Sequence, residues 1–79
     1  MSLNQKLSDD INAIIEQCSN DEINYILSDC VMILELDIIS NPYNFIDLLS
    51  NAYDIAYEND LEDIKEQIRK AIENYSNNF

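Results

Sequence analysis

Carboxylates and tyrosines crowd one short stretch of the chain. Residues 53–63 read YDIAYENDLED and contain five carboxylates, two tyrosines and no basic side chain. Carboxylates can serve as general acids or bases, bind hard cations, or pair with the Lys and Arg residues of another protein. Tyrosine is a frequent anchor of protein interfaces. The residues of this stretch are therefore compatible with three kinds of chemistry: catalysis, cation binding and recognition of a basic surface.

The residue types that the chain lacks limit the first two kinds. The sequence has no histidine, which supplies the commonest general base and the imidazole ligand of many metal sites. It also has no glycine, which phosphate-binding loops and standard calcium-binding loops require. Carboxylate pairs such as Asp54 with Glu58, or Glu62 with Glu66, could hold a hard cation at high concentration. Helix-borne di-iron sites add a Glu-x-x-His pattern that this chain cannot form. The sequence therefore predicts no enzyme, no cofactor and no dedicated metal site.

Two cysteines, Cys18 and Cys30, lie on the apolar faces of two successive predicted helices. In an antiparallel helical hairpin their offset along the helix axis is about 12 Å. A disulfide needs Cα atoms within about 7 Å of each other. We therefore expect two free, reduced thiols in the core, which suits a cytoplasmic protein.

Charge is distributed unevenly along the chain. The net charge is −12, and of the sixteen acids only Glu66 and Glu73 follow Lys65, so residues 7–64 carry fourteen carboxylates and no base. The four basic residues lie near the ends, at Lys6, Lys65, Arg69 and Lys70. A nucleic acid would be repelled, since its affinity for proteins comes largely from Lys and Arg. The negative electrostatic field of the chain attracts a strongly basic protein and accelerates encounter with it.

Apolar residues recur at spacings of three and four along four segments, which predicts four helices. The first stripe consists of Leu3, Leu7, Ile11, Ile14, Ile15 and Cys18, and the second of Ile23, Ile26, Leu27, Cys30 and Leu34. The third consists of Phe45, Ile46, Leu49, Ala52, Tyr53 and Ala56, and the fourth of Leu61, Ile64, Ile68, Ala71, Ile72 and Tyr75.

Polar residues mark the joints between these helices, near 19–20, 40–41 and 59–60. Ser19 with Glu22 forms a capping pattern for the second helix, and Pro42 suits the first position of the third. Asn59 and Asp60 can cap the fourth helix. Because the chain has no glycine, the left-handed residue that commonly ends a helix must be an asparagine or be avoided, and Asn20, Asn41 and Asn59 stand at the three joints and can adopt it.

The pattern as a whole predicts an all-α fold, either a compact four-helix bundle or an orthogonal helical array. We expect residues 1–79 to form a single helical domain, because short joints favour antiparallel neighbours. No apolar run approaches the roughly 18 residues that cross a bilayer, and the N-terminus lacks the pattern of a secretory signal. A cytoplasmic location is expected.

The second and third helices are apolar over a wider sector than the other two. Leu48 and Ile55 widen the sector of the third to about 200°, against roughly 100 to 120° in the first and fourth. Met32 and Leu36 belong to a second apolar side of the second helix. These two helices are therefore expected at the centre of the fold, or at an interface between two copies.

The acids of the third predicted helix form an outward column. Asp47, Asn51, Asp54 and Glu58 fall at i, i+4, i+7 and i+11, opposite the apolar sector. A similar column on the fourth helix, broken by Arg69, contains Glu62, Glu66 and Glu73. An ordinary solvated helix face mixes charges of both signs. Here an i to i+4 pair of opposite charges is expected only between Glu66 and Lys70.

We therefore expect a non-enzymatic protein that binds and blocks a basic, nucleic-acid-handling protein. The expected partner-binding residues are Asp47, Asp54, Tyr57, Glu58, Asp60, Glu62 and Asp63. In class, such a protein resembles phage anti-restriction or anti-CRISPR inhibitors and the small helical immunity proteins of nuclease toxins, although the tyrosine-pair motif of the immunity proteins is absent.

Two other interpretations remain open at this point. The acidic surface is a merely solvated face, or the chain is an interaction module that uses the apolar sides of the second and third helices. In the second case its partner is a helix of another protein or a second copy, which makes a homodimer.

Overall fold

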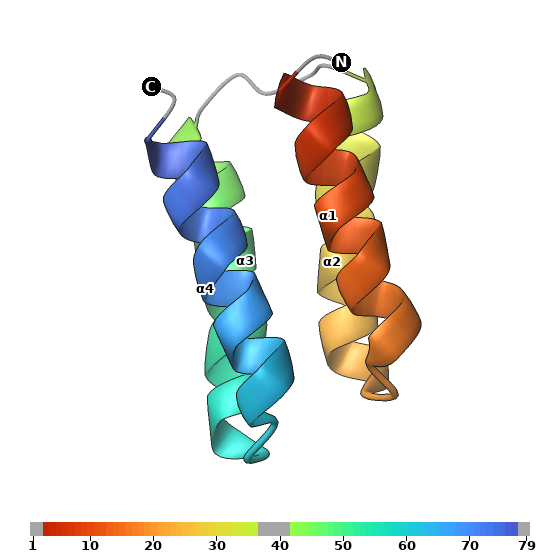
Figure 1. Ribbon diagram of the computed structural model, residues 1–79, viewed down its shortest axis with the longest axis vertical. Coiled ribbons are helices and arrows are strands. Elements are labelled where there is room, and N and C mark those ends of the chain that lie inside the picture. Colours follow the sequence, from red (N-terminus) through yellow and green to blue (C-terminus); the bar gives the residue numbers. More distant parts are fainter. Residues whose placement is uncertain (1–2, 37–41, 78–79) are drawn as a thin grey trace.

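The computed structural model describes residues 3–36 and 42–77, and in these residues it contains four α-helices. Their bounds are α1 (Leu3–Gln17), α2 (Asp21–Leu36), α3 (Pro42–Glu58) and α4 (Glu62–Ser76). The helices lie side by side and alternate in direction (Figure 1). The all-α prediction is confirmed, and the arrangement is an up-and-down four-helix bundle. The predicted joint at 40–41 lies outside the described residues.

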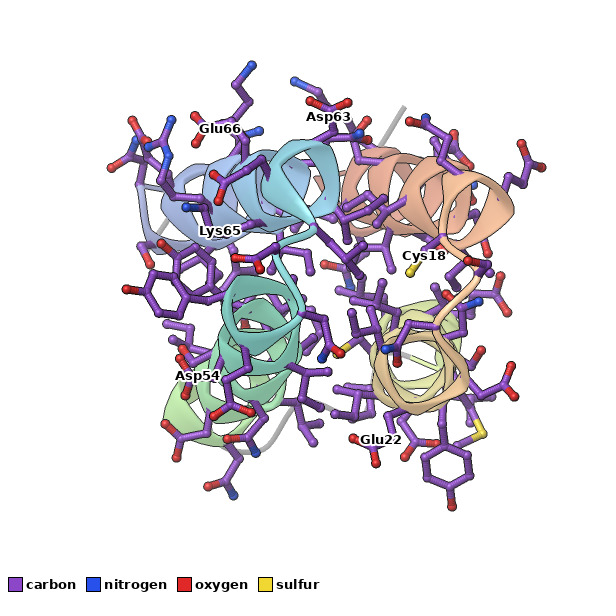
Figure 2. All side chains as sticks on the ribbon, turned by 90° about the horizontal axis from the view of Figure 1, so that it is seen from below. Cys18, Glu22, Asp54, Asp63, Lys65 and Glu66 are labelled. Atoms are coloured by element: carbon purple, nitrogen blue, oxygen red, sulfur yellow. The ribbon has the colours of Figure 1, made fainter. Side chains whose placement is uncertain are left out.

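The helices form a ring in which each one packs against two neighbours. The packed pairs are α1 with α2, α2 with α3, α3 with α4, and α4 with α1. Viewed along the axis, they occupy the four corners of a square (Figure 2). In the described residues no helix is surrounded by the others, so the expectation that α2 and α3 are central is wrong, and its alternative, an interface between two copies, stays a prediction. The wide apolar sectors of α2 and α3 must be explained differently.

The core consists of the predicted stripes. In the described chain, fully or nearly fully buried apolar residues come from all four helices, among them Ile11, Leu27, Leu49 and Ile68. Other stripe residues, such as Ile26 and Ile72, are partly buried and pack against this core. The side chain of Leu3 lies outside the described part. Between α3 and α4 the rings of Phe45 and Tyr75 meet with their centroids 4.6 Å apart.

One buried polar residue was not expected. Ser8 on α1 is only 2% exposed, and its hydroxyl has no hydrogen-bond partner among the described residues. It lies beside Leu7 in the sequence, at the edge of the apolar stripe of α1. A buried hydroxyl without a partner costs free energy, so this position weakens the bundle slightly.

The joint between α1 and α2 is closed by Asn20. Its side-chain Oδ1 accepts a hydrogen bond of 3.0 Å from the backbone N–H of Ile23, which makes Asn20 the N-cap of α2. Asn24 in turn donates from Nδ2 to the carbonyl of Cys18, at 2.7 Å. The predicted capping pair of Ser19 and Glu22 is therefore one residue early, because Asn20 is an equally good cap and stands next to the first helical residue.

The joint between α3 and α4 is a complete Schellman motif. The N–H of Leu61 donates to the carbonyl of Ala56 at 2.9 Å, and the N–H of Asp60 donates to the carbonyl of Tyr57 at 3.2 Å. Asp60 has φ of 57° and is the only described residue with positive φ. It thus occupies the left-handed position at which glycine is usual.

These contacts correct two sequence predictions. The left-handed residue of this joint is Asp60 and not Asn59, whose side chain instead donates to the carbonyl of Ile55 at 2.8 Å. Asn20 also lacks positive φ, and Asn41 lies outside the described residues. The N-cap of α4 is Leu61, without a side-chain hydrogen bond, so neither Asn59 nor Asp60 caps that helix. Asp60 ends α3, and this role prevents it from capping α4.

Candidate partner-binding surface

The antiparallel topology brings two of the joints to the same end of the bundle. The joint after α1 and the joint after α3 both lie at the bottom of Figure 1. Exposed carboxylates flank both joints, and together we call them the acidic end: Glu16, Asp21, Glu22, Glu58, Asp60, Glu62 and Asp63. Four of the seven lie on α3, α4 or their joint, and two more begin α2. Glu16, Asp21 and Glu22 were not among the predicted site residues, although their positions beside a joint between antiparallel helices already indicated this end.

The acidic column of α3 is exposed along its whole length. Asp47, Asn51, Asp54 and Glu58 all have exposed side chains, as their spacing predicted. Figure 2, which views the bundle from the acidic end, shows Asp54 on the outside of the ring. Asp47 stands about 16 Å along the helix from Glu58, because eleven residues separate them. The column therefore runs up the side of the bundle from the acidic end.

The expected column of α4 is neutralised by its own helix. Arg69 donates to Glu66 from Nε at 3.0 Å and to Glu73 from Nη1 at 2.8 Å. Lys65 forms an ion pair of 2.8 Å with Glu62. The predicted pair of Glu66 with Lys70 is wrong, because the planar guanidinium of Arg69 reaches one turn in both directions. Hydrogen bonding to Arg69 lowers the pKa of Glu66, and the same contacts raise the pKa of Arg69.

Lys65 connects α4 to an exposed tyrosine of α3. Its ammonium lies 5.3 Å from the centre of the Tyr57 ring, within the range of a cation–π contact. A hydrogen bond to Glu62 is the main reason that the pKa of Lys65 is raised. Tyr57 is 63% exposed, so most of its ring is available to a partner. In Figure 2 Lys65 lies in the seam between α4 and α3.

Besides Asp47, four predicted site residues have no ion-pair partner within residues 3–36 and 42–77. They are Asp54, Glu58, Asp60 and Asp63. Asp63 lies in the first turn of α4, where the helix dipole favours an anion. Glu58 is the last residue of α3, where the dipole disfavours one. Helix electrostatics thus account for Asp63 and leave Glu58 without a structural reason.

One large exposed residue, Tyr25 on α2, was not among the predicted site residues. It is 72% exposed, and Met32 and Leu36 on the same helix are 50% and 61% exposed. These three positions fall at i, i+7 and i+11, which places them on one outward stripe opposite the buried residues. The spacing was available in the sequence. Tyr25 was overlooked because it stands between Ile23 and Ile26, both of which belong to the apolar stripe.

The two cysteines lie in the interior of the bundle. Cys18 and Cys30 are both buried and free, as expected, and Figure 2 shows Cys18 turned towards the interior. Burial, with a smaller contribution from the charge of Asp29, raises the pKa of Cys30 to about 12. In the described part of the chain no three His, Cys, Asp or Glu residues are grouped so that they could hold a metal ion. No helix there is long and apolar enough to cross a membrane.

The fold and this surface define a four-helix bundle with one acidic end. Comparison of the chain with protein-family models, curated proteins and solved structures gave no match. Its function is therefore inferred from geometry and charge.

Proposed function

We propose that this protein binds a basic, nucleic-acid-handling protein and blocks the surface with which that protein holds DNA or RNA. The observation that carries the proposal is the acidic end, together with the adjoining column of α3 that contains Asp54. Carboxylates from both helical joints meet there, Asp54, Glu58, Asp60 and Asp63 have no ion pair among the described residues, and Tyr57 is exposed beside them. Lys65 is the nearest base in the sequence.

The spacing of the charges suits a basic partner. Acids one helical turn apart are separated by about 5 to 6 Å, which is of the same order as the spacing of phosphates along a nucleic-acid strand. A protein that clasps phosphates with Arg and Lys could accept this surface in their place. Such an interface forms rapidly at low salt and weakens as salt is added.

The placement of some acids also costs stability. Glu16 and Glu58 lie in the last turns of α1 and α3, both at the acidic end, and none of the four described helices has a base in its last turn. A base there would interact favourably with the helix dipole, whereas an acid does not. A surface that is only solvated has no reason to keep this arrangement. A surface that must attract cations does.

A pull-down from host extract at low salt, eluted with a salt gradient, tests the proposal. We expect a basic nucleic-acid-binding protein in the late fractions, and we expect the captured protein to lose its nucleic acid when this chain is added. The double variant Asp54→Lys with Glu58→Lys should release it at lower salt. The control, Asp9→Lys with Glu35→Lys, makes the same change of net charge elsewhere on the bundle. Recovery of no basic protein would contradict the proposal.

A second candidate function rests on the exposed stripe of Tyr25, Met32 and Leu36 on α2. In this case the chain is an interaction module whose apolar stripe packs against a helix of another protein or against a second copy. Binding would then persist at high salt and would be lost on Leu36→Ala. Leu48 is less suitable for this test, because it is partly buried and packs against the core. Binding that weakens with salt and tolerates Leu36→Ala favours the first function.

A further inference from the structure

The seam between α2 and α3 contains an apolar groove that opens at the acidic end. The groove has a volume of about 400 Å³ and is lined by Asp21, Glu22, Tyr25, Ile26 and Ile55. Ile26 and Ile55 form its floor, because both are partly buried and pack against the core. Tyr25, which is 72% exposed, stands beside them.

Carboxylates stand on both helices that form this groove. Asp21 and Glu22 occupy the first turn of α2 at its open end, and Figure 2 shows Glu22 on the side of α2 that faces α3. On α3, Glu58 follows Ile55 by three residues, so it lies one turn further towards the acidic end. The groove is therefore apolar at its floor and negative at both edges.

We propose that this groove binds a basic amphipathic helix of the partner protein. Apolar side chains of that helix contact Ile26, Ile55 and the ring of Tyr25. Its Lys and Arg side chains lay their aliphatic stems on the same floor and place their charged heads against the carboxylates of Asp21, Glu22 and Glu58. A helix fits because the groove lies between two antiparallel helices, the arrangement into which amphipathic helices commonly dock.

Charge complementarity selects this occupant over a second copy of the chain. Two copies would each carry a net charge of −12 and would place acidic edges against acidic edges. The proposal rests on the proposed function and specifies it further, since it states which part of the partner is recognised. It also gives the wide apolar sectors of α2 and α3 a role, because the partly buried isoleucines of the seam are the floor of the groove.

A designed peptide can test the groove before any partner is known. The probe is a peptide of about 18 residues, long enough to form a helix, with Leu on one face and Lys and Arg on the others. Two further peptides serve as controls: one has the same composition with Leu scattered around the helix, and the other has Gln in place of Lys and Arg. Each is titrated into isotope-labelled protein, and backbone amide shifts give the site and the affinity.

We expect the amphipathic basic peptide to bind more tightly than either control, with the largest shifts at Tyr25, Ile26 and Ile55. Tyr25→Ala should weaken binding by about tenfold, since an exposed tyrosine at an interface centre is a typical hot spot. Met32→Ala is the matched control, because Met32 is also an exposed apolar residue of α2 but lies seven residues beyond Tyr25 and does not line the groove. It should change the affinity less than about twofold, well below a hot-spot effect.

Three outcomes would overturn the groove assignment. They are equal binding of the scattered peptide, shifts centred on Tyr57 and the α3–α4 seam, or self-association of the free protein that Tyr25→Ala abolishes. The groove assignment fails while the proposed function stands if a captured basic partner elutes at lower salt from the double variant Asp54→Lys with Glu58→Lys but elutes unchanged from Tyr25→Ala. The proposed function fails if the extract contains no basic partner, whatever the peptide does.

Discussion

The ammonium of Lys65 lies over the ring of Tyr57, 5.3 Å from its centre. This contact places a positive charge beside the acidic surface, and Lys65 is the first base after Lys6, because residues 7–64 contain none. Lys65 also pairs with Glu62 at 2.8 Å, so one side chain partly neutralises a carboxylate and partly covers the candidate anchor.

Removal of this cation should strengthen partner binding. Lys65→Met keeps an aliphatic side chain against α3, removes the positive charge and uncovers the face of Tyr57. We expect the affinity for a basic partner to rise by about two- to fivefold, the usual scale of one surface charge pair. Lys70→Met is the control, since it makes the same change of charge at an exposed position further along α4. Calorimetry at fixed salt measures the affinity of both variants for the partner. An equal gain of affinity in both would contradict a local role for Lys65.

Asp60 should be replaceable by glycine with a gain in stability. Its φ of 57° disfavours a residue with a Cβ atom, and glycine removes that cost. We expect Asp60→Gly to raise the free energy of unfolding by about 0.5 to 1 kcal/mol and Asp60→Ala to lower it by a similar amount. Urea denaturation of the three proteins measures this, and an alanine variant as stable as the glycine variant would contradict the left-handed assignment.

Glu58 should show a conflict between stability and binding. As the last residue of α3 it opposes the helix dipole, so Glu58→Lys is expected to stabilise the free protein by about 0.3 to 1 kcal/mol. The same change should lower the affinity for the basic partner, because it reverses a charge of the acidic end.

Asp63→Lys is the matched control for Glu58→Lys. It reverses a charge at the same end of the bundle but in the first turn of α4, where the dipole favours an acid. It should lower both the stability of the fold and the affinity for the basic partner. Thermal unfolding and binding are measured on both variants, and loss of stability in both would show that the dipole does not govern Glu58.

The thiol of Cys30 gives the fold a dependence on alkaline pH. Burial raises its pKa to about 12, so the native protein keeps the proton at pH values where the unfolded chain, with a thiol pKa of about 8.5, has lost it. The unfolded state then binds fewer protons, and stability falls as pH rises above about 9, by at most about 1.4 kcal/mol per pH unit.

Two measurements check this prediction. The loss of stability between pH 8 and pH 10 should be shallower in Cys30→Ala than in the unchanged protein, although the variant starts from a lower value because it leaves a cavity. At pH 8 a thiol reagent should label Cys30 in the folded protein only slowly, since little thiolate is present. Labelling of Cys30 as rapid as in the denatured chain would contradict its burial.

The helices could be predicted because each carries an apolar stripe at regular spacing, and Leu7, Leu27, Leu49 and Ile68 are buried as their positions required. The ends of the helices were harder, since neighbouring residues offered equivalent caps. Ser19 and Asn20 both suit an N-cap, and only the hydrogen bond to Ile23 selects Asn20. Asp60 was misassigned because the same side chain can cap a helix or adopt the left-handed conformation.

The candidate surface could be predicted in part for a similar reason. The column of Asp54 and Glu58 follows from spacing along one helix. The neutralisation of Glu66 and Glu73 by Arg69 depends on side-chain reach in both directions, and a rule for pairs at i and i+4 selected Lys70 instead. The groove between Ile26 and Ile55 joins residues of two helices, so it required the packing of α2 against α3.

The central claim is that charge on the acidic end holds a basic partner, and the salt dependence of that binding tests it most directly. The dissociation constant of the captured partner would be measured from low to high salt for the unchanged protein and for Asp54→Lys with Glu58→Lys. We predict that affinity falls by more than about tenfold as the screening length shortens from about 10 Å to about 3 Å, and that the fall is shallower in the double variant. An affinity that does not change with salt, or a slope that the double variant leaves unaltered, would contradict the claim.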